Sequence, residues 1–457
     1  MKKTDCLFVY PGAPSGKKNL LPIMPAGLLS MAAYLEKNSL KSAIISLPSA
    51  PKGEFDLPAL IKAGRVRLVC IPAHWHRQTG GALQLAKEIK RAVPGIKIAL
   101  GGYTASCFAA EILEGYPAVD YVVRGDGELP LLKLLGSLKA GGAGLGGVPN
   151  LAWRRGGRVV LNKASYFAGK ADLALSVMSG FSLVLNSNLK PRRGICFEDG
   201  MFTYLQARGC ADNCSACGGA KDAQRRSCGR KGVSLRSPAA VVRDFEELAA
   251  AGIKEIQLPL NPLPSYAHYI EILKLLLKKK FRPVLKIELC GLPSDRLLKW
   301  FSLALGPESK MTIFAGSGSE RVRRLNRGRF YTNNSLLRTL KKAGLLGVNI
   351  WTAFTSGLPF ETRRDVALTA ALMKRMRREL KVNRAGVYAF SLEPGSPLFE
   401  QPEKYGVWLR RTTLEDFLAQ RGKYDMGYAT EHFTEKEIVG NIKFLEKTAL
   451  EQGVSGR

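Results

Sequence analysis

Short apolar runs alternate with stretches of helical periodicity along the first third of the chain. Short, mainly apolar runs predict buried strands at 6–10, 43–47, 68–71, 96–100 and 121–123. Between them, apolar residues recur at helical spacing and predict helices at 25–37, 81–92, 105–113 and 129–138. Buried strands that alternate with helices are typical of a parallel, doubly wound α/β sheet, so we expect such a domain over residues 1–138.

The loops that follow these strands carry candidate binding residues. A doubly wound sheet binds ligands at the carboxyl ends of its strands, and glycines there let the backbone approach a bulky, flat ligand. The residues that we single out are Pro11, His74, His76, Gln78, Gly101, Gly102, Tyr103, Thr104, Arg124, Gly125 and Glu128. The order His-Trp-His would place both imidazoles on one side of a strand end, either near a ligand or in ordinary loop hydrogen bonds. No Gly-x-Gly-x-x-Gly follows the first strand, which argues against a dinucleotide site.

A second alternating series begins near residue 201. The first strand of this series begins at residue 201, and five further strand-like runs, at 255–260, 284–289, 311–315, 348–354 and 385–390, are separated by helical patterns. Six βα units are too few for a closed eightfold barrel. We therefore predict a partial (β/α)6 barrel over residues 201–400.

The remaining segments predict a connection and an extension. Residues 139–200 begin with a glycine-rich run and include a hairpin pattern at 150–155 and 158–161, so we assign them to a linker. Residues 401–457 predict a small helical extension, with helices at 414–420 and 436–451.

Composition and charge limit the class of protein. Apolar residues make up 46% of the 457 residues, enough for a large core. The 69 basic and 38 acidic residues leave a net charge of +31, which suits an anionic partner and equally suits a generally basic proteome. The densest basic stretches are not interleaved with aromatic residues, so nucleic acid is a possible partner that we do not favour. The longest uncharged runs are broken by polar residues, so we predict no membrane span.

Three of the nine cysteines, Cys210, Cys214 and Cys217, form the pattern C-x3-C-x2-C. Three thiols so close cannot all form local disulfides. A structural zinc site usually needs four ligands and no nearby histidine completes one, although a zinc knuckle or three unrelated thiols stay as alternatives. Three thiolates at one tight turn suit a 4Fe-4S cluster with one iron left free of protein. Such a trio needs a reducing compartment, so we expect a cytoplasmic protein.

This spacing resembles the hallmark of the radical S-adenosylmethionine (radical SAM) family, in which the open iron binds the amino and carboxylate groups of SAM. The resemblance implies that the three cysteines ligate a 4Fe-4S cluster and that an external donor such as flavodoxin or ferredoxin supplies electrons. The residues that it assigns to SAM binding are Gly218, Gly219, Ser317, Ser319 and Gly357, and Arg327 and Gly328 also fit its pattern. The family usually has an aromatic residue just before the third cysteine; because Ala216 stands there, we expect the packing of the SAM adenine to differ.

The first domain resembles the cobalamin-binding domain that precedes many radical SAM cores. The resemblance is carried by residues 25–29, 101–104 and 119–128, in that order. It implies that the loop residues singled out above bind cobalamin. The motif Asp-x-His-x-x-Gly, whose histidine binds cobalt in mutase-type corrinoid proteins, is absent, so we expect cobalamin to be held without that ligand.

Together the two resemblances imply a cobalamin-dependent radical SAM enzyme with a small-molecule or peptide substrate. The commonest reaction implied is methyl transfer from methylcobalamin to an unactivated carbon or a phosphorus centre. One alternative is a cobalamin-linked rearrangement or cyclisation without methyl transfer. Another is a corrinoid and iron–sulfur sensor without catalysis. Methylthiolation of RNA, which the positive charge would suit, is a further alternative that we do not favour.

Overall fold

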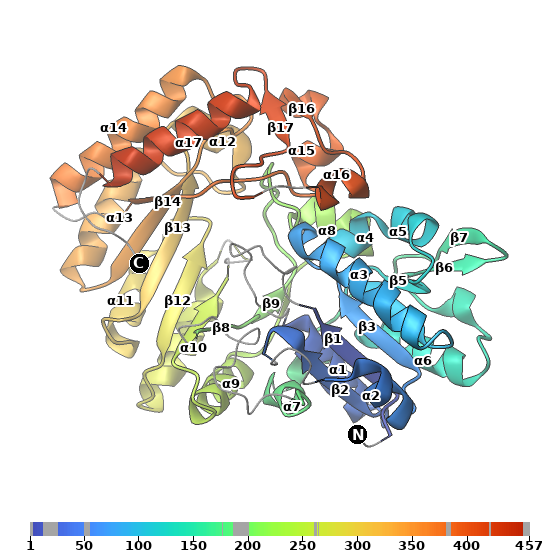
Figure 1. Ribbon diagram of the computed structural model, residues 1–457. Coiled ribbons are helices and arrows are strands. Elements are labelled where there is room, and N and C mark those ends of the chain that lie inside the picture. The colour runs from blue at the N-terminus through green and yellow to red at the C-terminus, as the bar shows by residue number, and fades with distance from the viewer. Residues whose placement is uncertain are drawn as a thin grey trace. The chain divides into compact units, whose positions relative to one another are not determined.

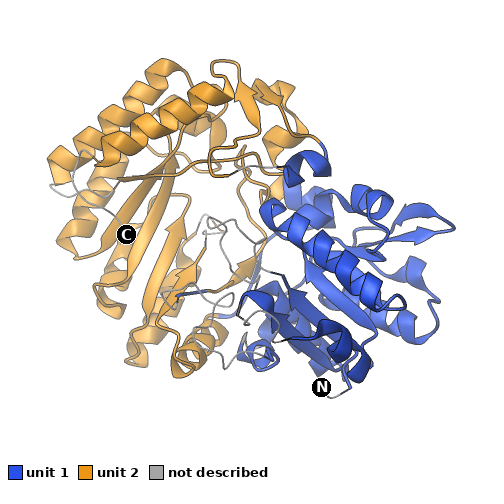
Figure 2. Cartoon of the chain, viewed as in Figure 1, with its two compact units in different colours: residues 1–202, 223–237, 413–419 blue, residues 203–222, 238–412, 420–457 orange. Residues whose placement is uncertain are grey.

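The chain divides into two compact units (Figure 2). The computed structural model describes residues 3–11, 26–49, 55–175, 177–185, 201–259, 263, 265–380, 385–419 and 422–450. The first unit comprises residues 1–202, 223–237 and 413–419, and the second comprises residues 203–222, 238–412 and 420–457. Each unit is built on a sheet of its own.

The first unit contains a seven-stranded sheet with the order β2-β1-β3-β4-β5-β6-β7 (Figure 1). Its parallel strands are β1 (Cys6–Tyr10), β2 (Ser42–Ser46), β3 (Leu68–Pro72), β4 (Lys97–Gly101) and β5 (Tyr121–Val123). Every residue of β1, β2 and β3 is buried, which explains why these strands consist mainly of apolar residues, although β2 begins and ends with a serine. The predicted doubly wound sheet is confirmed.

Helices connect these parallel strands. They are α1 (Gly27–Lys37), α2 (Leu57–Ala63), α3 (His76–Ala92), α4 (Tyr103–Cys107), α5 (Ala109–Gly115) and α6 (Glu128–Lys139). Helix α3 begins five residues before the predicted start at residue 81. Its first turns bury the polar side chains of Gln78 and Thr79, which a search for apolar periodicity does not register.

The predicted hairpin belongs to the first sheet. Strand β6 (Leu151–Arg155) pairs antiparallel with β5, and β7 (Arg158–Leu161) pairs antiparallel with β6. At the opposite edge, Ile44 of β2 forms a parallel bridge with Val184. We assigned residues 139–200 to a linker, but these parts of the segment extend the sheet at both edges, while residues 186–200 lie outside the described residues.

A second sheet has six strands in the order β15-β14-β13-β12-β11-β8, and strands β11 to β15 belong to the second unit. Its strands are β8 (Met201–Thr203), β11 (Glu255–Leu258), β12 (Val284–Leu289), β13 (Lys310–Gly316), β14 (Asn349–Phe354) and β15 (Ala385–Val387), and β11 to β15 are parallel. Buried and partly buried side chains alternate along β11 to β14, so one face of the sheet is closed and the other is not. The predicted partial barrel is confirmed.

Helices follow the strands of this second sheet, and Figure 1 shows α11, α13 and α14 along one side of it. They are α9 (Pro238–Ala250), α10 (Ala267–Lys278), α11 (Asp295–Ala304), α12 (Glu320–Asn326), α13 (Asn333–Leu345) and α14 (Arg363–Leu380). Ser319 and Thr332 cap α12 and α13, each accepting a backbone N–H from the first helical turn.

The C-terminal residues divide between the two units. In the second unit, β16 (Val407–Leu409) pairs antiparallel with β17 (Tyr428–Thr430), and α17 (Glu435–Leu450) packs on α14 and β15. Helix α16 (Leu414–Leu418) belongs to the first unit and packs on α3. The two helices predicted for this extension are present.

The remaining elements are short. They are η1 (Leu47–Ser49), η2 (Leu145–Gly147), η3 (Asp172–Ala174), η4 (Glu403–Tyr405), α7 (Val177–Phe181), β9 (Ala207–Arg208), α8 (Lys221–Cys228), β10 (Ser234–Leu235) and α15 (Pro397–Glu400). Within the described ranges, we find no helix with the length and apolar character needed to span a bilayer.

Two helical glycines of the first unit give opposite predictions. A Cβ on Gly180 of α7 would overlap the backbone of Leu29 in α1, whereas a Cβ on Gly136 of α6 meets nothing within 4 Å. We expect Gly180→Ala to destabilise the protein by about 1–3 kcal/mol through overpacking. Gly136→Ala should stabilise it by about 0.5–1 kcal/mol, because alanine favours a helix. Urea unfolding of both variants measures the difference, and an equal effect at the two sites would contradict the described packing of α7 on α1.

Candidate cofactor-binding sites

Cys210, Cys214 and Cys217 lie on one loop of the second unit, between β9 and α8, and all three are partly buried. The Cys217 backbone N–H donates to the Cys214 carbonyl at 3.3 Å, which folds the loop into a turn. Two other backbone N–H groups donate directly to sulfur: Asp212 to Cys210 at 3.4 Å and Gly328 to Cys214 at 3.3 Å. Donors directed at sulfur favour the thiolate, which is the form that binds metal.

The segment 326–329 holds this loop; it begins at Asn326, the last residue of α12, and we call it the clamp. The Ser215 backbone N–H donates to the Asn326 carbonyl at 3.0 Å, and Ser215 Oγ donates to Asn326 Oδ1 at 2.7 Å. Arg329 Nε forms an ion pair with Asp212 Oδ2 at 2.7 Å. A Cβ on Gly328 would overlap the Asp212 side chain, so this close approach requires glycine.

Burial governs the protonation of the cysteines. It raises the pKa of the Cys210 thiol to about 11 and that of Cys217 well above its ordinary value. A cationic partner would therefore be needed to ionise them at neutral pH. Across the described ranges, no group of three or more His, Cys, Asp or Glu side chains converges as a site for a single metal ion. A cubane cluster makes a different demand, because each cysteine binds a separate iron, and the donor set of three cysteines on one loop fits it.

Gly218 and Gly219 follow the third cysteine. Glu393, located after β15, accepts a hydrogen bond from the Gly218 backbone N–H at 2.6 Å. A Cβ on Gly218 would lie 2.9 Å from the Pro394 carbonyl oxygen, so glycine is needed there. The backbone of Gly219 lowers the pKa of Cys217, against the larger effect of burial. Sequence analysis gave Glu393 no role; its place directly after the sixth strand was the only signal for it.

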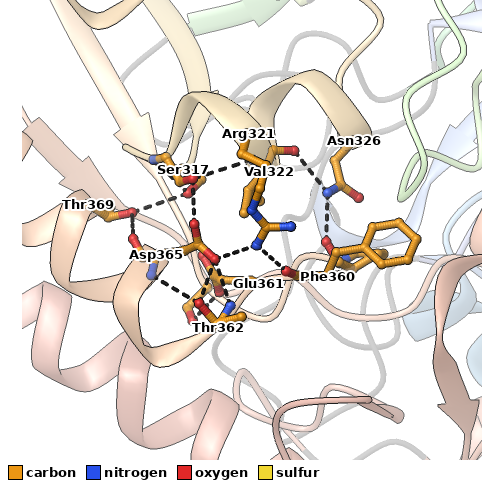
Figure 3. A network of polar contacts seen from close by, with 12 residues as sticks. Ser317, Arg321, Val322, Asn326, Phe360, Glu361, Thr362, Asp365 and Thr369 are labelled. Carbon is orange, nitrogen blue, oxygen red and sulfur yellow. Dashed lines mark hydrogen bonds and ion pairs between the residues drawn. The ribbon is translucent and has the colours of Figure 1, made fainter.

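Ser317 and Ser319 lie in the loop after β13, and both side chains are buried. Figure 3 shows this loop joined to α14 by a network of polar contacts. Ser317 Oγ lies 3.3 Å from Thr369 Oγ1, and Ser319 Oγ donates to Asp365 Oδ1 at 2.5 Å. Ser319 Oγ also accepts the Val322 backbone N–H as the N-cap of α12. The two hydroxyls therefore bond within the unit and fix the loop that precedes the clamp.

Gly357, after β14, is also enclosed by protein. Its φ is +90°, and a Cβ there would lie 2.6 Å from the Ile438 side chain of α17. Its N–H donates to Glu361 Oε2 at 2.7 Å, and its carbonyl accepts from the Tyr428 hydroxyl at 2.8 Å. These contacts make Gly357 a packing point between the β14 loop and the C-terminal helix.

Cys290 and Arg327 both interact electrostatically with Cys214 and with each other. Cys290 is buried at the end of β12, and burial raises the pKa of its thiol to about 12. The Arg327 guanidinium lowers that pKa, whereas the neighbouring Cys214 raises it. The C-x3-C-x2-C spacing could not reveal Cys290, because a residue 73 positions beyond Cys217 is brought close only by the parallel sheet.

The carboxyl ends of β3 and β4 bring four of the candidate residues of the first unit together. The His74 ring packs against Trp75 and Tyr103, with ring centroids 4.4 and 4.9 Å apart. The Thr104 backbone N–H and Oγ1 donate to the His74 carbonyl at 3.2 and 3.1 Å. Gly102 has φ +107°, and a Cβ there would lie 2.6 Å from His74 Cα. Trp75 remains 47% exposed at this edge, so a partner can reach it.

His76 and Gln78 have other neighbours. His76 begins α3, and its ring packs against Phe417 of α16 with centroids 5.4 Å apart. Gln78 is buried, and its Nε2 donates to the Tyr10 hydroxyl at 3.2 Å. The alternation that would place both imidazoles on one side fails, because the backbone turns helical at His76. Pro11 and Gly101, at the ends of β1 and β4, are partly buried.

Arg124 and Glu128 bind other parts of the first unit. The Arg124 guanidinium donates to the Asn162 carbonyl. Glu128 is fully buried and accepts a hydrogen bond from Ser30 Oγ at 2.8 Å. Both candidate cobalamin contacts thus have neighbours within the protein.

Gly125 and Asp126, which lie between Arg124 and Glu128 in the sequence, contact Cys228 and Arg230 in the segment 223–237. Gly125 has φ +71°, and a Cβ there would overlap the Cys228 side chain. Asp126 forms an ion pair with the buried Arg230 and accepts the Ala168 backbone N–H at 2.8 Å. This loop therefore joins three segments that are distant in sequence.

Comparison with known proteins bears on both units. A family model described as a B12 binding domain matches residues 20–135. The radical SAM methyltransferase TsrM from Kitasatospora setae, solved with a tryptophan substrate and the SAM analogue aza-SAM, aligns with a TM-score of 0.72 at 17% identity, over 98% of this chain and 89% of that chain. The cobalamin-dependent S-adenosylmethionine radical enzyme OxsB, solved with aqua-cobalamin, aligns with a TM-score of 0.72 at 14% identity, over 95% of this chain and 65% of that chain. Comparison with curated protein sequences gives no match.

The matches define the class of fold. The chain has the fold of cobalamin-dependent radical SAM enzymes, and it carries a B12-binding domain over residues 20–135. The resemblance found in the sequence is confirmed at the level of fold.

The buried carboxyl of Glu361 predicts a pH dependence of stability. Burial raises its pKa to about 7, against hydrogen bonds from Ser356 and Gly357 that lower it. Because its pKa is higher in the folded than in the unfolded state, its contribution is complete below about pH 4.5 and is lost as the pH rises through 7. The loss is at most about 1.4 kcal/mol for each pH unit. Glu361→Gln should flatten this part of the stability profile, measured by melting temperatures from pH 5 to 8.

The exposed Glu403 supplies the matched control. Glu403→Gln should leave the slope of the profile unchanged. An unaltered slope in Glu361→Gln would show that Glu361 is ionised throughout this range.

Proposed function

We propose that this protein is a cobalamin-dependent radical SAM enzyme that transfers a methyl group to an unactivated carbon or a phosphorus centre. The observation that carries the proposal is the loop of Cys210, Cys214 and Cys217, held by the clamp in a chain whose first unit matches a B12-binding domain. TsrM, which has the same fold, is a methyltransferase. The substrate class is a small molecule or a peptide.

The three cysteines are proposed to hold a 4Fe-4S cluster. Such a cluster with SAM supplies one-electron chemistry at the sulfonium. The N–H groups of Asp212 and Gly328 support the sulfurs, and the clamp keeps the loop in one conformation. The proposal includes an external one-electron donor of the flavodoxin or ferredoxin kind.

SAM binding is proposed to use the backbone of Gly218 and Gly219, beside the third cysteine. Glu393 fixes that backbone through the Gly218 N–H. Ser317, Ser319 and Gly357 are proposed to act indirectly, by shaping the loops after β13 and β14, since their polar groups bond within the protein.

Cobalamin is proposed to bind at the carboxyl ends of β3 and β4. His74, Gly102, Tyr103 and Thr104 lie together there, with Trp75 exposed beside them. Bound cobalamin would supply the methyl group. We propose no histidine ligand to cobalt, and Gln78 and Glu128 would support the domain from its interior.

The cysteine loop predicts the iron content. Anaerobically reconstituted protein should hold about four irons and four sulfides per chain. Replacing Cys210, Cys214 and Cys217 together by Ala should abolish both, whereas Cys228→Ala should retain them. Iron and sulfide assays with absorption spectra measure the outcome. Full iron content in the triple variant would refute the proposed ligand set.

The products of SAM distinguish methyl transfer from the alternatives. With cobalamin, SAM and a reductant, methyl transfer should yield S-adenosylhomocysteine in step with methylated substrate, measured by mass spectrometry of candidate small molecules and peptides. A rearrangement or cyclisation should yield 5'-deoxyadenosine without S-adenosylhomocysteine. If neither product forms and SAM leaves the cluster spectrum unchanged, the sensor function replaces the enzyme function.

A further inference from the structure

Arg327 is fixed beside Cys214 by the backbone on both sides of it. The preceding residue, Asn326, accepts the Ser215 backbone N–H at 3.0 Å through its carbonyl. The following residue, Gly328, donates its N–H to Cys214 Sγ at 3.3 Å. A residue held at both neighbours cannot move away from the cysteine loop unless the clamp opens.

The Arg327 side chain also has a defined position. Its guanidinium donates to the Phe314 carbonyl in β13. Within the described part of the chain, no carboxylate lies within ion-pair distance of Arg327. Two other arginines of this segment do form ion pairs: Arg321 with Asp365 at 2.6 Å, and Arg329 with Asp212 at 2.7 Å. A neutral carbonyl orients the guanidinium without cancelling its charge.

The Arg327 guanidinium interacts electrostatically with Cys214 of the cysteine loop. Cys214 and Cys290 both lie close enough to Arg327 to interact with it electrostatically. A guanidinium group is not deprotonated in proteins. Arg327 is therefore a permanent cation whose field acts on the sulfur of Cys214.

We propose that Arg327 raises the reduction potential of the cluster bound at Cys210, Cys214 and Cys217. The inference rests on the proposed function, because it presumes that a 4Fe-4S cluster binds there. Reduction adds one electron from the external donor to the cluster, and no bond or proton is exchanged. A fixed positive charge nearby stabilises the more negative, reduced state, and a hydrogen bond to a cysteine sulfur acts in the same direction. Arg327 and the Gly328 N–H both act through Cys214, so the clamp tunes the cluster that it positions.

Substitutions that change only the charge test this role. Arg327→Gln removes the cation and Arg327→Lys keeps it. Arg324→Gln removes a cation at an exposed position of α12, three residues before Arg327, where the guanidinium lies over the Phe330 ring at 3.8 Å. The full-length chain of each variant is reconstituted with iron and sulfide, assayed for both, and titrated with dithionite in redox mediators while electron paramagnetic resonance follows the reduced cluster.

In Arg327→Gln we expect the ratio of reduced to oxidised cluster at the wild-type midpoint to fall at least tenfold, which is 59 mV for a one-electron couple. Arg327→Lys should recover most of this loss, and Arg324→Gln should match the wild type. These results, obtained without SAM, would support the proposal.

Other outcomes overturn it. A full cluster with an unchanged midpoint in Arg327→Gln refutes the inference and leaves the proposed function intact. A shift seen only when SAM is present would place the action of Arg327 on the SAM carboxylate instead. If Arg327→Gln loses its iron, Arg327→Met repeats the titration with a different neutral side chain, and loss of iron there too makes the residue structural. If the wild type binds no cluster, the proposed function itself fails.

Discussion

The close contact between the clamp and the cysteine loop is the constraint on which the second unit depends. Gly328 approaches Asp212 so closely that no side chain fits between them, and its N–H donates to Cys214 Sγ. Two hydrogen bonds between Ser215 and Asn326 fix the register of the two segments. Each contact spans more than a hundred residues of sequence, so the geometry of the three thiols is set by α12 as much as by their own loop.

The loops after β13 and β14 depend on the same contact. Asn326 Nδ2 donates to the Pro359 carbonyl at 2.8 Å, and Arg321 donates to the Phe360 carbonyl at 2.7 Å (Figure 3). Asp365 accepts hydrogen bonds from Ser319, Thr362 and Arg321, and these lower the pKa of its carboxyl to about 2, against the opposing effect of burial. The loops that the family pattern assigns to SAM are thus held as one body with the clamp.

In the first unit, some candidate loop residues lie at an exposed site, whereas others hold parts of the protein together. At the carboxyl ends of β3 and β4, the backbone of His74 packs directly against Gly102, and Trp75 is exposed beside them. The loop 124–128 instead joins distant segments through Gly125 and the ion pair of Asp126 with Arg230. Its glycines and charges resemble those of a binding loop because close backbone approach and buried charge also serve internal packing.

The sequence by itself determined the two sheets, most of their strands and helices, and the cysteine loop, because apolar periodicity and short ligand spacing are local properties of the chain. From the sequence we assigned the hairpin at 150–161 to a linker, although β6 pairs with β5. The residues of a hairpin predict its own turn and strands but do not identify the strand of another segment with which it pairs. Only the tertiary structure decided that Ser317 and Ser319 are buried and that Glu393, Cys290 and Arg327 lie by the cysteines. A parallel sheet gathers the ends of successive strands at one edge, so these side chains become neighbours only when it forms.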